Sequence, residues 1–235
     1  MSEIKECTRG SHWIHDGVRT LWFKFNHWRE NPTYFYPDGI WVFCGAQGSG
    51  KTLSAVSCLS KMVERYPRAR VISNMPLQNI PTVIEPFEDY SQLSTESNGV
   101  EGIIFFLDEI HVLWNSLESK DIPITEMATF CQMRKDRRVI IGTSQVYGRI
   151  AKPIREQLKY LIDCHNFGGF FQYNDVCDPT ESTEIQGHIH PNLIYRSCWF
   201  HSPELYQMYE TLNKIERVKR SPLLPDSNDS KFFRG

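Results

Sequence analysis

Residues 45–52 read Gly45-Ala46-Gln47-Gly48-Ser49-Gly50-Lys51-Thr52 and match the phosphate-loop pattern G-x-x-x-x-G-K-[ST] at every specified position. An apolar run (40–44) precedes them and a helix-like segment (53–65) follows. These flanks argue against the alternative, a glycine-rich turn that matches the pattern by chance. Glycines let successive backbone N–H groups point at phosphate oxygens, and the start of the next helix adds unsatisfied donors. We therefore predict that all eight residues bind the phosphates of ATP.

The carboxylates of a nucleotide site follow about fifty residues later. A continuous apolar run at 103–107 predicts a strand buried on both faces, and it ends in Asp108 and Glu109. We expect Lys51 to reach the β- and γ-phosphates and the Thr52 hydroxyl and Asp108 to hold Mg²⁺. Glu109 is expected to orient and deprotonate the attacking water. An acidic strand end facing solvent is the alternative, and the phosphate loop upstream argues against it.

Gln145 follows the next apolar run, 139–143. Residues just past the carboxyl ends of central parallel strands line the ligand crevice. A glutamine there can donate to the γ-phosphate or to the attacking water without adding charge. Because it is the third polar strand end in order, we predict that Gln145 senses the γ-phosphate.

Length and composition are typical of a soluble globular protein, since the 235 residues are 40% hydrophobic and 23% charged. We see no apolar run that would span a bilayer and no secretory pattern, and the seven cysteines lack paired spacing. These features predict a cytoplasmic protein (host cytoplasm, if a phage encodes it) with no transmembrane segment and with reduced thiols, peripheral to a virion or membrane only through partners. Cysteines and histidines gather in the C-terminal third, but they match no zinc spacing, which favours buried thiols and surface imidazoles over a metal site.

The charge is unevenly distributed. The whole chain carries −2, whereas Arg134 to Lys159 holds eight basic and two acidic residues, a net +6 that leaves −8 elsewhere. Such a segment can meet DNA phosphates or a neighbouring subunit's nucleotide. The alternative is a solvated helix face.

We divide the chain into an aromatic N-terminal arm (1–39), an ATPase core (40–165), a β-rich C-terminal extension (166–220) and a mobile tail (221–235). In the arm, 18–28 is expected to form an amphipathic helix that ends at Asn31-Pro32 and packs on the core or on a partner subunit. In the core, strands alternate with helices, which predicts a three-layer α/β fold with a mainly parallel sheet.

Hydrophobic periodicity predicts the remaining elements. In the core we expect a strand at 70–73, an irregular stretch at 75–100, a helix at 125–137 with Met127, Phe130, Cys131 and Arg134 on one face, a helix at 153–160 and a strand at 161–164. In the extension we expect short antiparallel strands at 170–173, 185–189 and 193–200, then a helix that starts at Pro203 with Ser202 as its cap.

The order of these motifs resembles the FtsK/HerA superfamily of DNA-pumping ATPases, and within it the Zot-type (zonular occludens toxin-like) proteins of filamentous phages and related viral packaging ATPases. The resemblance covers about residues 40–165 and rests on 45–52, Ser73-Asn74, 107–109, 133–135 with 139–145, and Ile154-Arg155. It implies a P-loop NTPase fold of the ASCE type and an Mg²⁺-dependent ATPase. It also implies a homo-oligomeric ring, for example a hexamer.

The resemblance assigns to 51, 52, 108, 109 and 145 the roles given above. Arg134 occupies the place of the Arg in the family's His-Arg-His-like motif, which makes it the first candidate for an arginine finger that reaches a neighbour's nucleotide, and Arg155 is the second. Two features depart from the family: Lys135 replaces the usual second His, and no transmembrane helix follows the core. Both favour a soluble motor over a membrane-anchored export protein.

Three functions fit this sequence. The leading one is an ATP-hydrolysing motor of a phage, virus or mobile element that translocates DNA, packages a genome or drives virion assembly, with DNA and assembly proteins as partners. The second is a soluble Zot-like assembly ATPase that reaches the membrane through a partner. The third is a non-motor ATP-binding switch, which would not need the catalytic base Glu109. A small-molecule kinase fits less well, because we identify no Arg-rich lid or acceptor pocket.

Overall fold

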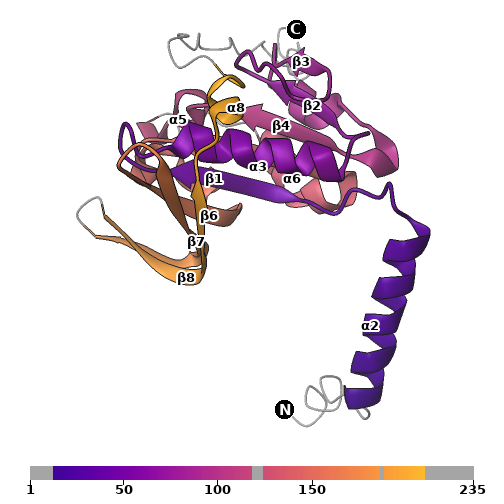
Figure 1. The fold of residues 1–235 in the computed structure, drawn as a ribbon. Helices are drawn as coiled ribbons and strands as arrows, with labels where there is room; N and C mark the ends of the chain where they lie inside the picture. The colour runs from indigo at the N-terminus through magenta and orange to yellow at the C-terminus, as the bar shows by residue number, and fades with distance from the viewer. Residues whose placement is uncertain (1–12, 118–123, 186–187, 210–235) are drawn as a thin grey trace, which may run out of the picture. The chain divides into compact units, whose positions relative to one another are not determined.

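The computed structural model describes residues 13–117, 124–185 and 188–209. It divides the chain into two compact units, Met1–Tyr34 and Phe35–Gly235 (Figure 1), and each is described here by itself. The second unit holds both the expected core and the described part of the expected extension. The expected tail at 221–235 lies outside the described residues.

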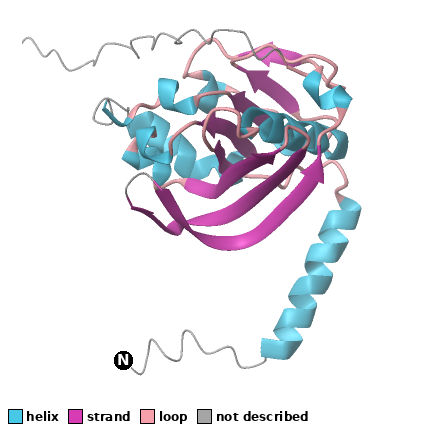
Figure 2. Ribbon diagram, turned by 60° about the vertical axis from the view of Figure 1, so that its left-hand side comes forward, coloured by secondary structure: helices cyan, strands magenta, loops and turns pink. Residues whose placement is uncertain are grey.

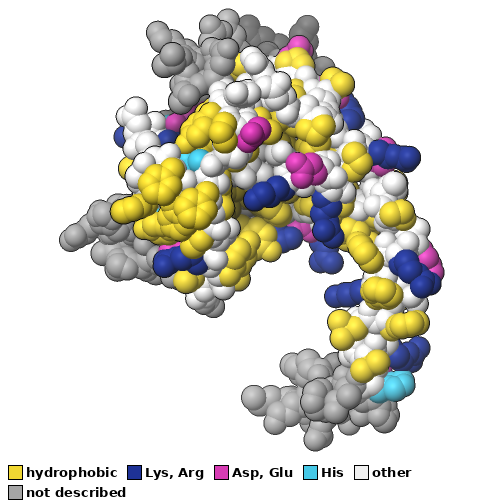
Figure 3. All heavy atoms as spheres, in the orientation of Figure 1, with side chains coloured by type: hydrophobic (Ala, Val, Ile, Leu, Met, Phe, Trp, Pro, Cys, Tyr) yellow, Lys and Arg dark blue, Asp and Glu magenta, His cyan; other side chains and the backbone are white. Residues whose placement is uncertain are grey.

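The first unit contains the helix α2 (Trp13–Glu30). It is longer than the expected 18–28, and it ends just before Asn31-Pro32 as predicted. The backbone N–H and the side-chain amide of Asn31 both donate to the His27 carbonyl, at 3.0 and 2.9 Å, which closes the last turn. Apolar and basic side chains are interleaved along α2 (Figure 3), and its exposed apolar side chains are Val18, Leu21, Trp22, Phe23, Phe25 and Trp28.

The second unit is built on one eight-stranded sheet with the order β3-β2-β4-β5-β1-β6-β7-β8 (Figure 2). The pairs from β3 to β6 are parallel, and β6, β7 and β8 pair antiparallel. The strands are β1 (Gly39–Cys44), β2 (Arg70–Ser73), β3 (Ile84–Pro86), β4 (Ile103–Leu107), β5 (Arg138–Ser144), β6 (Leu158–Phe167), β7 (Phe171–Ile185) and β8 (His188–Phe200). The helices are α3 (Lys51–Arg65), α4 (Gln92–Thr95), α5 (Ile110–Leu113), α6 (Ile124–Asp136), α7 (Lys152–Arg155) and α8 (Pro203–Tyr206), with the 3-10 turns η1 (Gly99–Glu101) and η3 (Tyr147–Arg149). The predicted α/β fold with a mainly parallel sheet is confirmed.

β4 shows that the sheet is covered on both faces. All five of its residues are buried. Its first, third and fifth side chains join a core that includes residues of α5, α6 and α7. Its second and fourth join a separate core that includes residues of α3. Because side chains alternate between the faces of a strand, these two cores lie on opposite sides of the sheet and make three layers.

The inward face of α6 differs from the expected one. Phe130 and Met133 are buried, and the Phe130 ring meets Trp114 edge-on at 5.4 Å between centroids. Cys131 and Arg134, expected on the same face, are exposed. Positions 130 and 133 lie about 60° apart around a helix of 3.6 residues per turn, whereas position 131 is rotated by about 100° from 130. The buried stripe therefore follows the three-residue step.

The chain after α7 departs most from expectation. Leu158 already pairs with Ile40 of β1, so the expected helix at 153–160 is wrong in its second half. There the hydrogen bonds with β1 outweigh the local preference of the sequence for a helix, because tertiary contacts often override such preferences. In place of the expected short strands, the structure has two long strands, β7 and β8, which extend the core sheet. α8 begins at Pro203 as predicted, but the Ser202 side chain makes no capping hydrogen bond.

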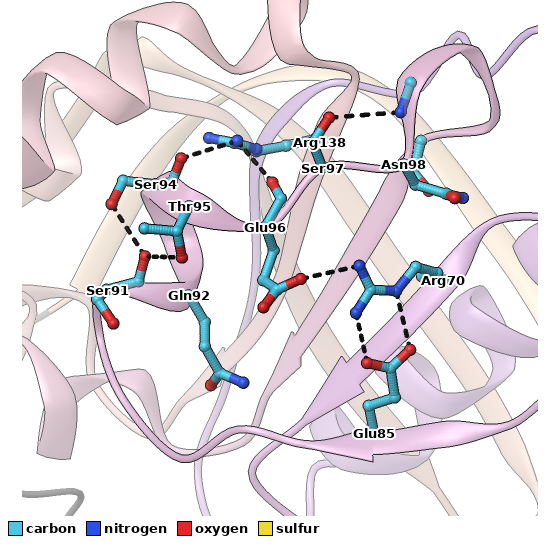
Figure 4. A network of polar contacts seen from close by, with 12 residues as sticks. Arg70, Glu85, Ser91, Gln92, Ser94, Thr95, Glu96, Ser97, Asn98 and Arg138 are labelled. Carbon is cyan, nitrogen blue, oxygen red and sulfur yellow. Dashed lines mark hydrogen bonds and ion pairs between the residues drawn. The ribbon is translucent and has the colours of Figure 1, made fainter.

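Two arginines hold the stretch between β2 and β4 (Figure 4), which the sequence predicted to be irregular. The stretch contributes the edge strand β3 and the short α4. Arg70 donates to both carboxylate oxygens of Glu85, at 2.9 and 2.6 Å, and to Glu96 at 2.8 Å. Arg138, whose side chain is 6% exposed, donates to three backbone carbonyl oxygens in and after α4, at 2.7, 2.8 and 3.0 Å. These contacts between distant residues order a segment that has no periodicity of its own.

The six cysteines in the described ranges are free thiols. Within those ranges no group of three or more His, Cys, Asp and Glu side chains is arranged to hold a metal ion. None of the helices described combines the length and apolarity that a membrane crossing requires.

Candidate active site

The phosphate loop joins the C-terminal end of β1 to the first turn of α3, in the predicted place. Gly48 and Gly50 have φ values of 80° and 78°, in the left-handed region that favours glycine. A Cβ on Gly50 would lie 2.2 Å from Oε1 of Gln172, so a larger residue would displace that buried amide. These two glycines let the backbone turn tightly at the start of α3, as a loop that binds phosphate requires.

Five predicted residues line one cavity of about 580 Å³ beside this loop: Lys51, Thr52, Asp108, Glu109 and Gln145. The sheet order explains why they meet. β5 lies between β1 and β4, and all three are parallel, so their carboxyl ends share one edge of the sheet. Local sequence places one group at each strand end, and the topology brings the three ends together.

Thr52 and Asp108 form the candidate magnesium site. The Thr52 hydroxyl donates to Oδ1 of Asp108 at 3.2 Å, and the Thr143 hydroxyl donates to the same oxygen at 2.6 Å. Burial raises the pKa of Asp108, while these two hydrogen bonds act in the opposite direction. Hydroxyl and carboxylate oxygens are hard donors, and Mg²⁺ in nucleotide sites takes one or two protein ligands beside phosphate oxygens and water. The donor set fits this ion.

Glu109 is held in a strained position next to the lysine. Its φ of 52° is unusual for a residue other than glycine, and such conformations cluster at active sites. Its backbone N–H donates to the Thr143 hydroxyl at 2.9 Å. Its Oε1 accepts a hydrogen bond from Nε2 of Gln145 at 3.2 Å and lies 3.9 Å from Nζ of Lys51. The carboxylate thus lies between the amide of Gln145 and the ammonium of Lys51.

The sequence motifs assign no role to the residues that hold the two carboxylates, although Asn74 belongs to one of the segments on which the resemblance rests. The Asn74 amide donates to the backbone carbonyl of Asp108 at 2.9 Å, and its Oδ1 accepts the Asp108 N–H at 2.8 Å. Nδ1 of His111 lies 3.1 Å from Oε2 of Glu109 and 3.2 Å from Oγ of Ser144. Burial lowers the pKa of His111, although the Glu109 carboxylate acts in the opposite direction. In the sequence, His111 could have been noticed because it lies two residues after Glu109. Asn74 could have been noticed because it directly follows the strand at 70–73.

Three more residues of the cavity wall come from the end of the described chain: His201, Tyr206 and Tyr209. They lie more than ninety positions after Asp108 and belong to no motif that we quoted. No signal in the sequence would have placed them at the phosphate loop.

The two candidate finger arginines lie away from this cavity. The Arg134 side chain is 92% exposed, and its Nε is 3.9 Å from Oδ2 of Asp38. Because Asp38 precedes β1 and the phosphate loop follows it, Arg134 lies at the opposite end of the strand from the nucleotide site of its own chain. The guanidinium of Arg155 lies over the Tyr147 ring, 5.2 Å from its centroid.

The basic segment from 134 to 159 is only partly a surface. Arg138 is buried against backbone carbonyls, and Lys159 pairs with Asp38. Arg149 is exposed at the end of η3, and its charge contributes to the lowered pKa of His111. The exposed positive charge is therefore smaller than the count of eight basic residues indicated.

The comparisons with known proteins agree with this geometry. A family model described as "ATPase family associated with various cellular activities (AAA)" matches residues 41–165. No curated protein sequence matches the chain.

Among solved structures, the N-terminal domain of zonular occludens toxin from Neisseria meningitidis is similar to this chain with a TM-score of 0.53 at 14% identity, and the match covers 73% of this chain and 98% of that one. The genome packaging NTPase B204 from Sulfolobus turreted icosahedral virus 2, in complex with AMPPCP, has a TM-score of 0.49 at 10% identity, over 66% of this chain and 97% of that one. At these identities the likeness to the toxin domain concerns the fold, and it agrees with the Zot-type P-loop fold expected from the motifs.

Proposed function

This chain belongs to the ATPase family associated with various cellular activities, and we propose that it is an Mg²⁺-dependent ATPase that works as a ring-shaped motor on DNA or in virion assembly. Its family membership and its phosphate loop make it a P-loop ATPase. The motor, the ring and the substrate are the proposal.

The observation that carries hydrolysis is the placement of Glu109 between Gln145 and Lys51. In the proposed reaction a water oxygen attacks the γ-phosphorus, the bond to the bridging oxygen of ADP breaks, and Glu109 accepts the proton that the water loses. Lys51 offsets negative charge on the phosphates, and Gln145 orients Glu109 or the water. When bound at Thr52 and Asp108, Mg²⁺ would neutralise phosphate charge.

One observation supports a ring. Arg134 is exposed at the far end of β1 from its own phosphate loop, so it can serve a nucleotide only in a neighbouring copy. A contact in which one surface of each copy meets a different surface of the next closes into a ring when the rotation allows it. The fold of the toxin domain agrees with the Zot-type resemblance from which the proposal starts. The exposed basic residues 134, 135, 149 and 152 offer a surface for DNA phosphates.

The deciding experiment is ATPase activity with and without double- and single-stranded DNA, together with the mass in solution with and without ATP. Strong stimulation of an ATP-dependent oligomer by DNA would support the motor. An active oligomer that is indifferent to DNA would favour the second candidate, a Zot-like assembly ATPase that reaches the membrane through a partner. Tight ATP binding without turnover would favour the third candidate, a non-motor ATP-binding switch.

A further inference from the structure

Residues 201–209, which we call the strap, leave the end of β8 and pass beside the first turn of α3 (Figure 1). The far end of the strap pairs with the loop after β2. There the Gln78 N–H donates to the Met208 carbonyl at 2.8 Å, and Tyr209 forms a β-bridge with Leu77. The strap therefore connects the antiparallel edge of the sheet with the parallel half.

The strap forms one wall of the 580 Å³ cavity that also contains Lys51 and Glu109. Three ring side chains, His201, Tyr206 and Tyr209, make this wall. The cavity thus has a polar part at the phosphate loop and an aromatic part at the strap. A nucleoside triphosphate has the same two parts, a charged chain of phosphates and a planar base.

The Tyr206 ring is fixed by its hydroxyl, while much of it stays accessible. The hydroxyl donates to the Gly169 carbonyl at 3.0 Å and contacts Nδ1 of His201. The rings of His201 and Tyr206 meet edge-on, at 5.6 Å and 69°, and Tyr206 is 49% exposed. In the described part of the chain the Tyr206 ring meets only the edge of His201, whereas Tyr209 packs partly against the core that includes α3. The exposed Tyr206 ring remains able to stack on a flat ligand, and the partly buried Tyr209 lines the cavity beside it.

A second cavity, of about 800 Å³, adjoins residues 44–49 and is a poorer site for a base. Its Tyr173 ring is already covered, because His165 stacks on it at 4.6 Å and the Arg196 guanidinium lies 5.3 Å from its centroid. Its other tyrosine, Tyr147, carries the Arg155 guanidinium over its ring. The carboxylate of Asp163 also lines this space and would repel phosphate.

We propose that the strap is the nucleobase site of this ATPase: Tyr206 and Tyr209 hold the base of the nucleotide whose phosphates occupy 45–52. This rests on the proposed ATPase function and adds its base-binding residues. Stacking reads the flat face that all bases share, so the strap contributes equally to ATP and GTP binding.

A chain of hydrogen bonds connects the strap to the phosphate loop. Nε2 of His201 lies 3.3 Å from Oε1 of Gln172, and Nε2 of Gln172 donates to the Ser49 carbonyl at 2.9 Å. Gln172 is fully buried and also donates to Asn174 at 2.9 Å. A base on the strap and phosphates on the loop are therefore held by one connected framework.

The test compares the binding of ATP, GTP and inorganic tripolyphosphate, which has phosphates and no base, to the full chain by calorimetry. The variants are Tyr206→Ala with Tyr209→Ala, and Tyr206→Phe, which keeps the ring without the hydroxyl. Tyr195→Ala, an exposed tyrosine of β8 outside this cavity, is the matched control. We expect the double variant to weaken ATP and GTP binding about tenfold or more while tripolyphosphate affinity is kept. Tyr206→Phe should bind ATP within a few-fold of the wild type.

Three outcomes would overturn the proposal. Unchanged ATP affinity in the double variant would place the base elsewhere, and a parallel loss of tripolyphosphate affinity would make the strap a structural support. A loss of ATP affinity with GTP affinity kept would show recognition of the base edge in place of stacking. Lys51→Ala separates this from the proposed function: if that variant still binds ATP and tripolyphosphate, the phosphates are not on the loop and the ATPase assignment itself fails.

Discussion

Nε2 of Gln145 donates to Oε1 of Glu109 at 3.2 Å, although the two residues follow different strands, β5 and β4. The same Glu109 oxygen lies 3.9 Å from Nζ of Lys51. A ligand that draws Gln145 toward a γ-phosphate must therefore change the surroundings of Glu109. In the proposed ATPase this hydrogen bond would couple the predicted sensor to the predicted base.

Gln145→Ala should lower kcat about 10- to 100-fold and change ATP affinity little, because it frees the Glu109 carboxylate and leaves the phosphate contacts in place. Steady-state ATPase kinetics and nucleotide titration measure the two quantities. Val146→Ala, the exposed next residue, is the control and should retain wild-type kcat. A rise in KM with an unchanged kcat would show that Gln145 only binds substrate.

Lys51→Ala and Glu109→Gln should separate binding from turnover. Lys51 offsets phosphate charge, so its loss should abolish measurable ATP binding. Glu109→Gln removes the base and should retain binding while turnover falls about 10²–10⁴-fold. Fluorescent-nucleotide titration and phosphate release report each effect, and equal loss of ATP affinity in both variants would refute the division of roles.

The partly buried His111 predicts lower stability in mild acid. Burial lowers the pKa of His111 below its ordinary value of about 6.5. As pH falls through about 6.5 the unfolded chain takes up a proton that the folded chain does not, so the free energy of unfolding decreases below this pH and is retained above it. Urea denaturation at about pH 7.5 and 5.5 should show a larger loss for the wild type than for His111→Asn. Identical losses would mean that another group titrates.

Arg134→Ala should leave ATP binding nearly intact and cut turnover by on the order of 10³ if Arg134 acts on a neighbour's nucleotide. Mixing this variant with Glu109→Gln should then restore activity, because some interfaces pair an intact Arg134 with an intact Glu109. Lys135→Ala, the adjacent exposed cation, is the control. Co-assembly of the two variants without recovery would rule out action in trans, and weaker DNA binding with a flatter salt dependence would identify a DNA contact instead.

The sequence predicted the parts of the site that depend on neighbours in the chain. The phosphate loop, the buried strand before Asp108 and the polar end at Gln145 are local patterns, and each lies where the pattern indicated. Asn74 entered only as part of the Ser73-Asn74 strand end and His111 not at all, because their roles come from distances that only the sheet creates. The prediction of a helix at 153–160 was wrong for the same reason, because the second half of this segment pairs with β1 as a strand.

Gln172 lies 123 positions after Ser49, the residue whose carbonyl it binds. During synthesis the phosphate loop is therefore complete in sequence long before its support exists, and a nascent chain that ends in β6 carries the motif without the amide that fixes it. The bridge between Leu77 and Tyr209 forms later still. The hydrogen bond from Gln172 to the loop can therefore form only after β7 has been synthesised.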